Sequence, residues 1–206
     1  NKKRVSSLKK NKSYISSVGN DILKRSQKNF VATSNIKDLK KTDIIIICVP
    51  TPINELSKIP NLNYVKEVIL KLKTIDLTHK LIIFECTSYP GTTEEMFLPL
   101  AKQKKLVLGD KIFLGYSPER EDPGNPNFSL EKKNIPKVTS GFTKKCQELT
   151  SLVYKQITKK LVQVNNIKTA EFTKLLENIY RSINIGLINE LSEISKKFNI
   201  DINESI

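Results

Sequence analysis

Two polar residues, Lys174 and Asn178, lie four positions apart in a segment with helical periodicity. At 3.6 residues per turn, this spacing puts both side chains on one face of a helix. An ammonium and an amide held side by side can donate hydrogen bonds to an oxygen that gains negative charge during a reaction. Glu171, Arg181 and Asn189 share this face, so an ordinary solvated helix surface is the alternative. Asparagine has a low helix propensity, however, and is an uncommon choice for such a surface.

Three segments rich in proline, glycine and polar residues follow apolar runs, where strands would end. They are PTP at 50–52, SYPGTT at 88–93 and SPEREDPGN at 117–125. Each segment alone could be a stiff turn. Ligands of open α/β sheets bind beyond the carboxyl ends of the strands, so three such loops together favour a ligand site. The Gly-Thr-Thr at 91–93 also opens a helical segment, whose free N–H groups could face a phosphate.

The elements that would position these residues alternate between two patterns. Apolar runs typical of strands occupy 43–49, 80–87 and 111–116, with weaker runs at 30–33, 136–140 and 160–164; helical periodicity occupies 62–77, 92–104 and 144–157. The runs DIIIICV and LIIF are apolar on both faces, which predicts strands buried on both sides of a parallel sheet. Strands that alternate with helices predict an α/β fold with a partial doubly wound, Rossmann-like parallel sheet.

A longer helical pattern covers residues 166–199, where apolar residues recur every three or four positions. A helix of this length exceeds the roughly 8–20 residues typical of globular domains. It predicts an element that connects two domains or packs against a second copy of the chain. We therefore divide the chain into a domain at 1–165 and a connecting or dimerisation segment at 166–206. Asp201 could cap a further helix.

The chain is strongly basic, with 35 Lys and Arg against 21 Asp and Glu, a net charge of +14. Such a balance usually suggests nucleic acid or an anionic membrane surface as a partner. Only four of the cations are arginines, however, and the first 41 residues hold 12 of the 35. Arginine supplies the bidentate fork that reads phosphate and guanine. We expect no nucleic-acid or membrane partner, although a basic α/β domain that binds nucleic acid through residues 1–41 stays an alternative.

Several other classes of protein are disfavoured. No apolar run is long enough to span a bilayer, and no apolar leader follows the basic N-terminus. One His and three scattered Cys argue against a metal site of ordinary spacing and against a disulfide framework, so a reducing, cytoplasmic location is expected. Cys48 and Cys86 lie in expected strands, where they would be small core residues rather than nucleophiles. The only methionine is Met96, so we expect the chain to be a fragment.

Five motifs occur along the chain in a fixed order. They are DIIIICVPTP at 43–52, ECTSYPGTTEE at 85–95, SPEREDPGN at 117–125, PKVTSG at 136–141 and AEFTKLLENIYRSINIGLINE at 170–190. Together they resemble the UDP-glucose/GDP-mannose dehydrogenase family over nearly all 206 residues. The form of the SPEREDPGN loop is most similar to the UDP-N-acetylglucosamine 6-dehydrogenase branch.

The resemblance implies an NAD-dependent oxidation that serves synthesis of a surface polysaccharide. The C6 alcohol of a UDP-sugar would become an aldehyde, then a cysteine thioester and finally a carboxylate. UDP-N-acetylglucosamine is the expected substrate, with UDP-glucose and UDP-N-acetylmannosamine as alternatives. The length of the helix at 166–199 further suggests a homodimer formed through it, although the oligomeric state stays open.

Catalytic roles carried over by motif fall on four residues. Thr87 would lie near the nicotinamide and the hydrolytic water, and Glu119 would position or activate that water. Lys174 and Asn178 would stabilise the alkoxide and the tetrahedral oxyanion, which agrees with their helical spacing. The catalytic cysteine of the family would lie beyond residue 206.

Cofactor-binding roles fall on the loops at the strand ends. Pro50, Thr51, Thr87 and Arg120 would contact NAD. No GxGxxG fingerprint is present among the seven glycines, and the resemblance places the glycine loop and the ribose-binding acid upstream of residue 1. One departure from the family is Cys86, which stands where a serine usually precedes the strand-end threonine.

Overall fold

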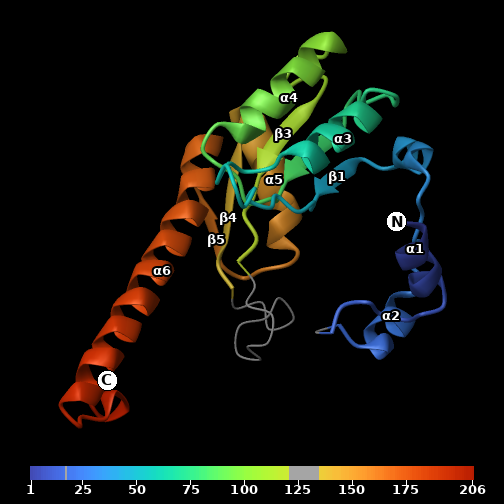
Figure 1. Ribbon diagram of the computed structural model, residues 1–206. Coiled ribbons are helices and arrows are strands. Elements are labelled where there is room, and N and C mark those ends of the chain that lie inside the picture. The colour runs from blue at the N-terminus through green and yellow to red at the C-terminus, as the bar shows by residue number, and fades with distance from the viewer. Residues whose placement is uncertain (17, 121–134) are drawn as a thin grey trace.

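The computed structural model describes residues 1–16, 18–120 and 135–206. Five strands form its central sheet in the order β1-β2-β3-β4-β5 (Figure 1). Their bounds are Ile44–Ile47 for β1, Leu81–Phe84 for β2, Phe113–Tyr116 for β3, Lys137–Gly141 for β4 and Leu161–Gln163 for β5. β1, β2 and β3 are parallel, β4 runs antiparallel to β3, and β5 is parallel to β4. The expected α/β sheet is confirmed, but it is not wholly parallel, because β4 and β5 run opposite to β1, β2 and β3.

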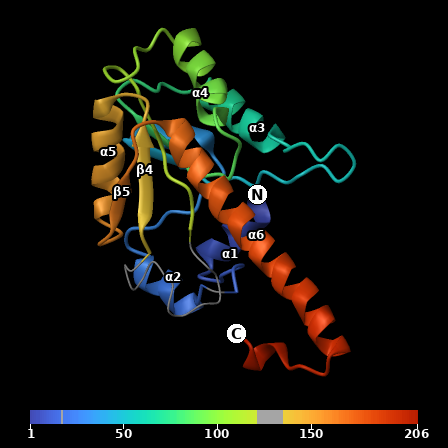
Figure 2. The ribbon, with the colours of Figure 1, turned by 90° about the vertical axis from the view of Figure 1, so that its left-hand side faces the viewer.

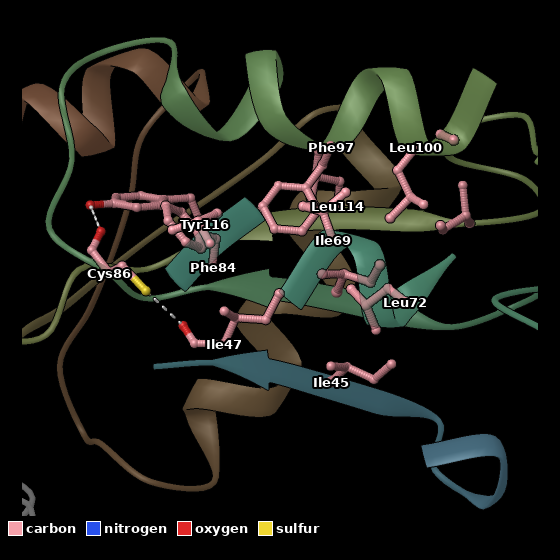
Figure 3. Packing of buried hydrophobic residues seen from close by; sticks show 14 of the residues in the cluster. Ile45, Ile47, Ile69, Leu72, Phe84, Cys86, Phe97, Leu100, Leu114 and Tyr116 are labelled. Atoms are coloured by element: carbon pink, nitrogen blue, oxygen red, sulfur yellow. Dashed lines mark hydrogen bonds between the residues drawn. The ribbon is translucent and has the colours of Figure 1, made fainter. Parts of the chain in front are cut away.

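Helices cover both faces of this sheet. Their bounds are Lys2–Lys9 for α1, Asn20–Ser26 for α2, Asn63–Leu72 for α3, Thr92–Gln103 for α4, Lys144–Lys155 for α5 and Ile167–Lys197 for α6, with 3₁₀ turns at Ile36–Lys41 (η1) and Ile202–Glu204 (η2). Figure 3 shows α3 and α4 packing on one face through Ile69, Leu72, Phe97 and Leu100. On the other face, Cys146 and Tyr154 of α5 pack against Leu81, Ile83 and Phe113.

The two apolar runs behave differently. All four residues of β2 are buried, as LIIF predicted. In β1, by contrast, Ile45 and Ile47 are buried while Ile44 and Ile46 are 41% and 42% exposed. The expectation that DIIIICV is buried on both faces is therefore wrong for this structure. The physical reason is that α5 packs mainly against β2, β3, β4 and β5, so it covers β1 only slightly.

Three local expectations are also corrected or refined. Residues 30–33 form no strand. Cys48 is exposed just beyond the end of β1 rather than buried, whereas Cys86 lies in the core. Asp201 does cap a helical turn, but that turn is the short η2, where the Asp201 side chain accepts a hydrogen bond from the Asn203 amide.

The long helix α6 is confirmed at 31 residues. Its first turn packs against the sheet through the buried Ile167, Ala170 and Glu171, and the remainder projects away from it (Figures 1 and 2). The orientation of every later side chain on α6 relative to the sheet therefore depends on how this first turn is held.

A buried carboxylate holds the first turn of α6. Glu171 accepts hydrogen bonds from the backbone N–H groups of Gly91 and Thr93 and from the Thr93 hydroxyl, at 2.7 Å for the last. These donors form the N-terminus of α4, where a negative charge is favoured. The sequence left a solvated surface as an alternative for Glu171, and it left open that the N–H groups at 91–93 face a phosphate. Neither possibility holds for these groups, because Glu171 and the N-terminus of α4 satisfy each other.

Gly91 makes this arrangement possible at the backbone. It precedes the first residue of α4 with φ of +101°, in the region that favours glycine. Burial raises the pKa of Glu171 above the usual glutamate value, against the opposite effect of the hydrogen bonds from Thr93 and Gly91.

Removing this carboxylate should destabilise the fold. In the complete protein, Glu171→Ala leaves the buried donors at Gly91 and Thr93 without an acceptor, and we expect a loss of roughly 1–3 kcal/mol in the free energy of unfolding. Urea unfolding followed by far-UV circular dichroism measures the change. Glu190→Ala, on the exposed part of α6, is the matched control. Equal urea midpoints for Glu171→Ala and Glu190→Ala would contradict the stabilising role of Glu171.

The raised pKa of Glu171 predicts how the stability of the fold changes with pH. The native state binds the Glu171 proton more tightly than the unfolded chain does, so the ionised carboxylate costs stability at neutral pH. As the pH falls from neutral toward the ordinary glutamate range, wild-type stability should rise relative to Glu171→Gln, which does not titrate. Urea midpoints of both proteins across this range test the sign. A stability difference that is flat or falls on acidification would refute it.

Candidate functional site

The loops that follow β1 and β2 meet at the carboxyl edge of the sheet. The two strands pair in register, with Ile47 opposite Phe84. Beyond them the Thr51 hydroxyl donates a hydrogen bond of 2.5 Å to the backbone carbonyl of Thr87. Thr51 is half-buried, whereas Pro50 and Thr87 are exposed. The structure thus brings together the three residues expected at this part of the edge and leaves their outer surface open to a ligand.

The loop after β3 starts at the same edge and turns toward α6. The Arg120 amide donates to Oε1 of Glu119 at 2.7 Å. The Arg120 guanidinium forms an ion pair with Glu177 of α6 and donates to the carbonyl of Pro136. Arg120 therefore fastens its loop to the long helix. Residues 121–125 of the SPEREDPGN motif lie outside the described residues.

Lys174 and Asn178 are both half-buried on α6, one turn apart. Burial lowers the pKa of Lys174; Arg181 and Arg120 act in the same direction, while Glu177 and Glu119 oppose them. The Lys174 ammonium is therefore within electrostatic range of the Glu119 carboxylate. A lysine whose pKa is lowered gives up its proton more readily and is a stronger hydrogen-bond donor.

Glu171 connects the part of α6 that carries Lys174 and Asn178 to the loop that carries Thr87. Its carboxylate lies within 3.5 Å of the Ser88 hydroxyl, directly after Thr87, and Lys174 follows it by three positions on α6. The hydrogen bonds of Glu171 thus fix the start of α6 against the loop that carries Thr87. The described site consists of two hydrogen-bonded loops and one helix that is anchored to them.

A charged cluster at the same edge was not singled out from the sequence. Lys137, the first residue of β4, is 3% exposed and forms ion pairs with Glu85 at 3.1 Å and Glu119 at 3.0 Å. The Tyr154 hydroxyl donates to Glu85, and the Lys137 ammonium lies 5.1 Å from the centre of the Tyr154 ring. The available signal was a charged residue in each of two motifs at strand ends, Glu85 in ECT and Lys137 in PKVTSG.

The cysteines near this edge are poor nucleophiles. Although Cys48 is exposed as a residue, desolvation of its thiol raises its pKa to about 12, aided by the hydrogen bond that the thiol donates to Glu85. Burial also raises the pKa of Cys86 to about 11. Both therefore remain thiols at neutral pH, and the thiolate is the reactive form.

Two further kinds of feature, a metal-binding cluster and a membrane-spanning helix, are absent from the part of the chain that the structure describes. In residues 1–16, 18–120 and 135–206, no group of three or more His, Cys, Asp or Glu could hold a metal ion. Within the same ranges, no helix has both the length and the apolar character needed to cross a membrane.

Comparisons with known proteins agree with the motif order. Residues 1–158 match the NAD-binding domain of the UDP-glucose/GDP-mannose dehydrogenase family, and residues 168–206 match its central domain. Protein CapL of Staphylococcus aureus is 41% identical over 99% of this chain and 47% of its own length. The UDP-N-acetyl-D-glucosamine 6-dehydrogenase of Salmonella typhi is 39% identical over 82% of this chain and 40% of its own length.

A solved structure is similar over the whole chain. The UDP-D-ManNAc dehydrogenase of Pyrococcus horikoshii superposes with a TM-score of 0.88 at 27% identity, covering 99% of this chain and 49% of the other. The chain spans about half the length of the proteins that it matches, and it belongs to the UDP-glucose/GDP-mannose dehydrogenase family.

Proposed function

We propose that the complete protein containing this chain is an NAD-dependent dehydrogenase that oxidises the C6 alcohol of a UDP-sugar to a carboxylate, via an aldehyde and a cysteine thioester. The observation that supports it most directly is the half-buried Lys174, within electrostatic range of Glu119 and on a helix anchored to the Thr87 loop. This arrangement supplies a cation for a developing oxyanion and a carboxylate for a water within one site.

UDP-N-acetylglucosamine is the proposed substrate, because the Salmonella typhi relative at 39% identity carries that activity in its name. The main alternative is UDP-N-acetylmannosamine, since a relative from Methanocaldococcus jannaschii at 35% identity is named for it. UDP-glucose is a third candidate. A role in surface polysaccharide synthesis and a cytoplasmic location complete the proposal.

The residues at the sheet edge fit a nicotinamide cofactor. Exposed Pro50 and Thr87 flank the half-buried Thr51 where β1 and β2 end, the usual position of a dinucleotide in such sheets. We propose that these residues line the nicotinamide half of NAD, which when bound accepts hydride from the sugar carbon. Arg120 is the weaker candidate for cofactor contact, because its guanidinium is engaged with Glu177.

The proposed catalytic roles follow from position and charge. Lys174 and Asn178 donate hydrogen bonds to the substrate oxygen as negative charge develops on it. Thr87 orients the hydrolytic water, and Glu119 takes its proton when the thioester is hydrolysed. Cys48 and Cys86 are held as thiols and Cys146 is fully buried, so the nucleophilic cysteine of this scheme would come from another part of the complete protein.

The domain division and the oligomeric state are also proposals. We propose that residues 1–165 belong to the NAD-binding domain, and that residues 166–206 connect it to the central domain and mediate a homodimer. The dimer is supported by exposed apolar side chains that recur along α6 beyond its first turn, among them Leu176, Ile179, Ile183, Leu187, Leu191 and Ile194. A surface helix usually keeps such residues covered.

The activity can be tested on the complete protein. With UDP-N-acetylglucosamine and NAD, we expect NADH to form at two molecules per sugar oxidised, because alcohol to carboxylate is a four-electron change. NADH absorbance measures it. Residues 1–206 expressed alone should not complete the four-electron oxidation, since the thioester step needs an activated cysteine, whereas Cys48 and Cys86 are held as thiols and Cys146 is fully buried. Absence of turnover with every UDP- and GDP-sugar would overturn the proposal.

Lys174 should control both the rate and its alkaline limit. Lys174→Met should lower kcat by about 10²–10³-fold, as the loss of an oxyanion donor does. Because the pKa of Lys174 is lowered, wild-type kcat should fall as the pH rises through a value below that of an ordinary lysine. In Lys174→Arg this alkaline fall should move to higher pH. Lys196→Met, on the exposed end of α6, is the control and should have the kcat and pH profile of the wild type. If kcat of Lys174→Arg falls at the same alkaline pH as kcat of the wild type, Lys174 is not the group whose deprotonation lowers the rate.

A further inference from the structure

A single buried ammonium serves two carboxylates at the site. Lys137 lies 3.1 Å from Oε1 of Glu85 and 3.0 Å from Oε2 of Glu119. Glu85 follows β2 directly, and Glu119 comes three positions after the end of β3. Glu119 is the more open of the two, with 42% of its side chain exposed against 13% for Glu85. Lys137 therefore joins an inner carboxylate to one that faces the site.

The strand register explains why Lys137 reaches both. β4 is antiparallel to β3, with Tyr116 opposite Ser140. Continuing this register for three residues brings position 119 opposite position 137. The reversed direction of β4 thus places its first residue at the edge where the parallel strands end. In a wholly parallel sheet, the first residue of β4 would lie at the other edge.

Charge balance shows what the ammonium does there. The Tyr154 hydroxyl from α5 and the Cys48 thiol beyond β1 both donate to Glu85, and neither adds a positive charge. Without Lys137, the carboxylates of Glu85 and Glu119 would face each other in a partly buried space. Two like charges so close disfavour joint ionisation, so one carboxylate would take up a proton or move away. Glu119 is the freer to move, because it is more exposed.

We propose that Lys137 is a positioning residue that fixes the ionised carboxylate of Glu119 for thioester hydrolysis by sharing its ammonium with Glu85. This inference rests on the proposed role of Glu119. In that step the water oxygen bonds to the thioester carbon, Glu119 takes the water proton, the C–S bond breaks, and the electron pair leaves with the sulfur. Lys137 touches neither the water nor the sugar and acts only through Glu119.

The first test is Lys137→Met in the complete protein. We expect kcat to fall by about 10²-fold, as for loss of a general base, while KM for the UDP-sugar stays within about threefold. The covalent sugar–protein thioester should accumulate and be visible by intact-mass spectrometry. Lys137→Arg, which keeps the charge, should restore most of the rate. Lys80→Met is the matched control: Lys80 is also buried but donates to the Lys40 and Thr42 carbonyls at the other edge of the sheet.

A double variant separates charge from packing. Glu85→Gln in the Lys137→Met background removes the like charge that faces Glu119, so Lys137→Met/Glu85→Gln should turn over several-fold faster than Lys137→Met. Loss of packing alone would make the double variant as slow as the single one or slower. That result, or a Lys137→Met protein with the kcat of Lys80→Met, would overturn the inference.

A readout independent of turnover keeps the two proposals apart. Crystal structures of the complete wild-type and Lys137→Met proteins should show the Glu119 carboxylate displaced in the variant only. If the wild type oxidises no UDP- or GDP-sugar, the proposed function fails, yet these structures still decide whether Lys137 positions Glu119. A Glu119 carboxylate that keeps its place without Lys137 refutes the positioning role whatever the enzyme's activity.

Discussion

The hydrogen bonds of the Glu171 carboxylate to the N-terminus of α4 are the interaction on which the site depends. Helix α6 contacts the sheet through its first turn and then extends away from it. The directions in which Lys174, Glu177 and Asn178 project therefore follow from how Glu171 is held. Burying a carboxylate is costly unless its oxygens are satisfied. Two backbone amides and the Thr93 hydroxyl donate hydrogen bonds to these oxygens. The same three donors are therefore not available to bind a ligand.

Lysine has several roles in this chain, which changes the meaning of its net charge of +14. Helices α1 and α2 contain no buried residue, so the lysines near the N-terminus form an exposed surface. Lys80 and Lys104 instead donate hydrogen bonds to backbone carbonyls, that of Lys40 for Lys80 and that of Ile75 for Lys104. Lys137 is a third case, an ammonium held between two carboxylates. An overall count of positive charge cannot distinguish a solvated surface from such buried contacts, because it contains no information on burial.

The residues of the site were predictable to different degrees. Lys174 and Asn178 share a helix face, and α-helical periodicity alone is sufficient to place them together. Thr51 and Thr87 follow parallel strands, whose carboxyl ends meet at one edge by topology. Their grouping is confirmed by a hydrogen bond, while their roles in binding and catalysis stay predictions. The anchoring role of Glu171 could not be predicted, because its helix position matches that of solvated residues and only the approach of α4 changes its surroundings.

Sequence periodicity by itself determined the strands at the centre of the sheet, the helices between them and the presence of the long helix α6, whose observed bounds lie within the predicted 166–199. These features depend on local backbone preference and on the alternation of apolar residues, both of which are readable along the chain. Tertiary structure alone decided that β4 reverses direction, that one face of β1 stays half exposed and that Lys137 lies between Glu85 and Glu119. Each of these depends on segments distant in sequence meeting in space, so no local pattern could have contained them.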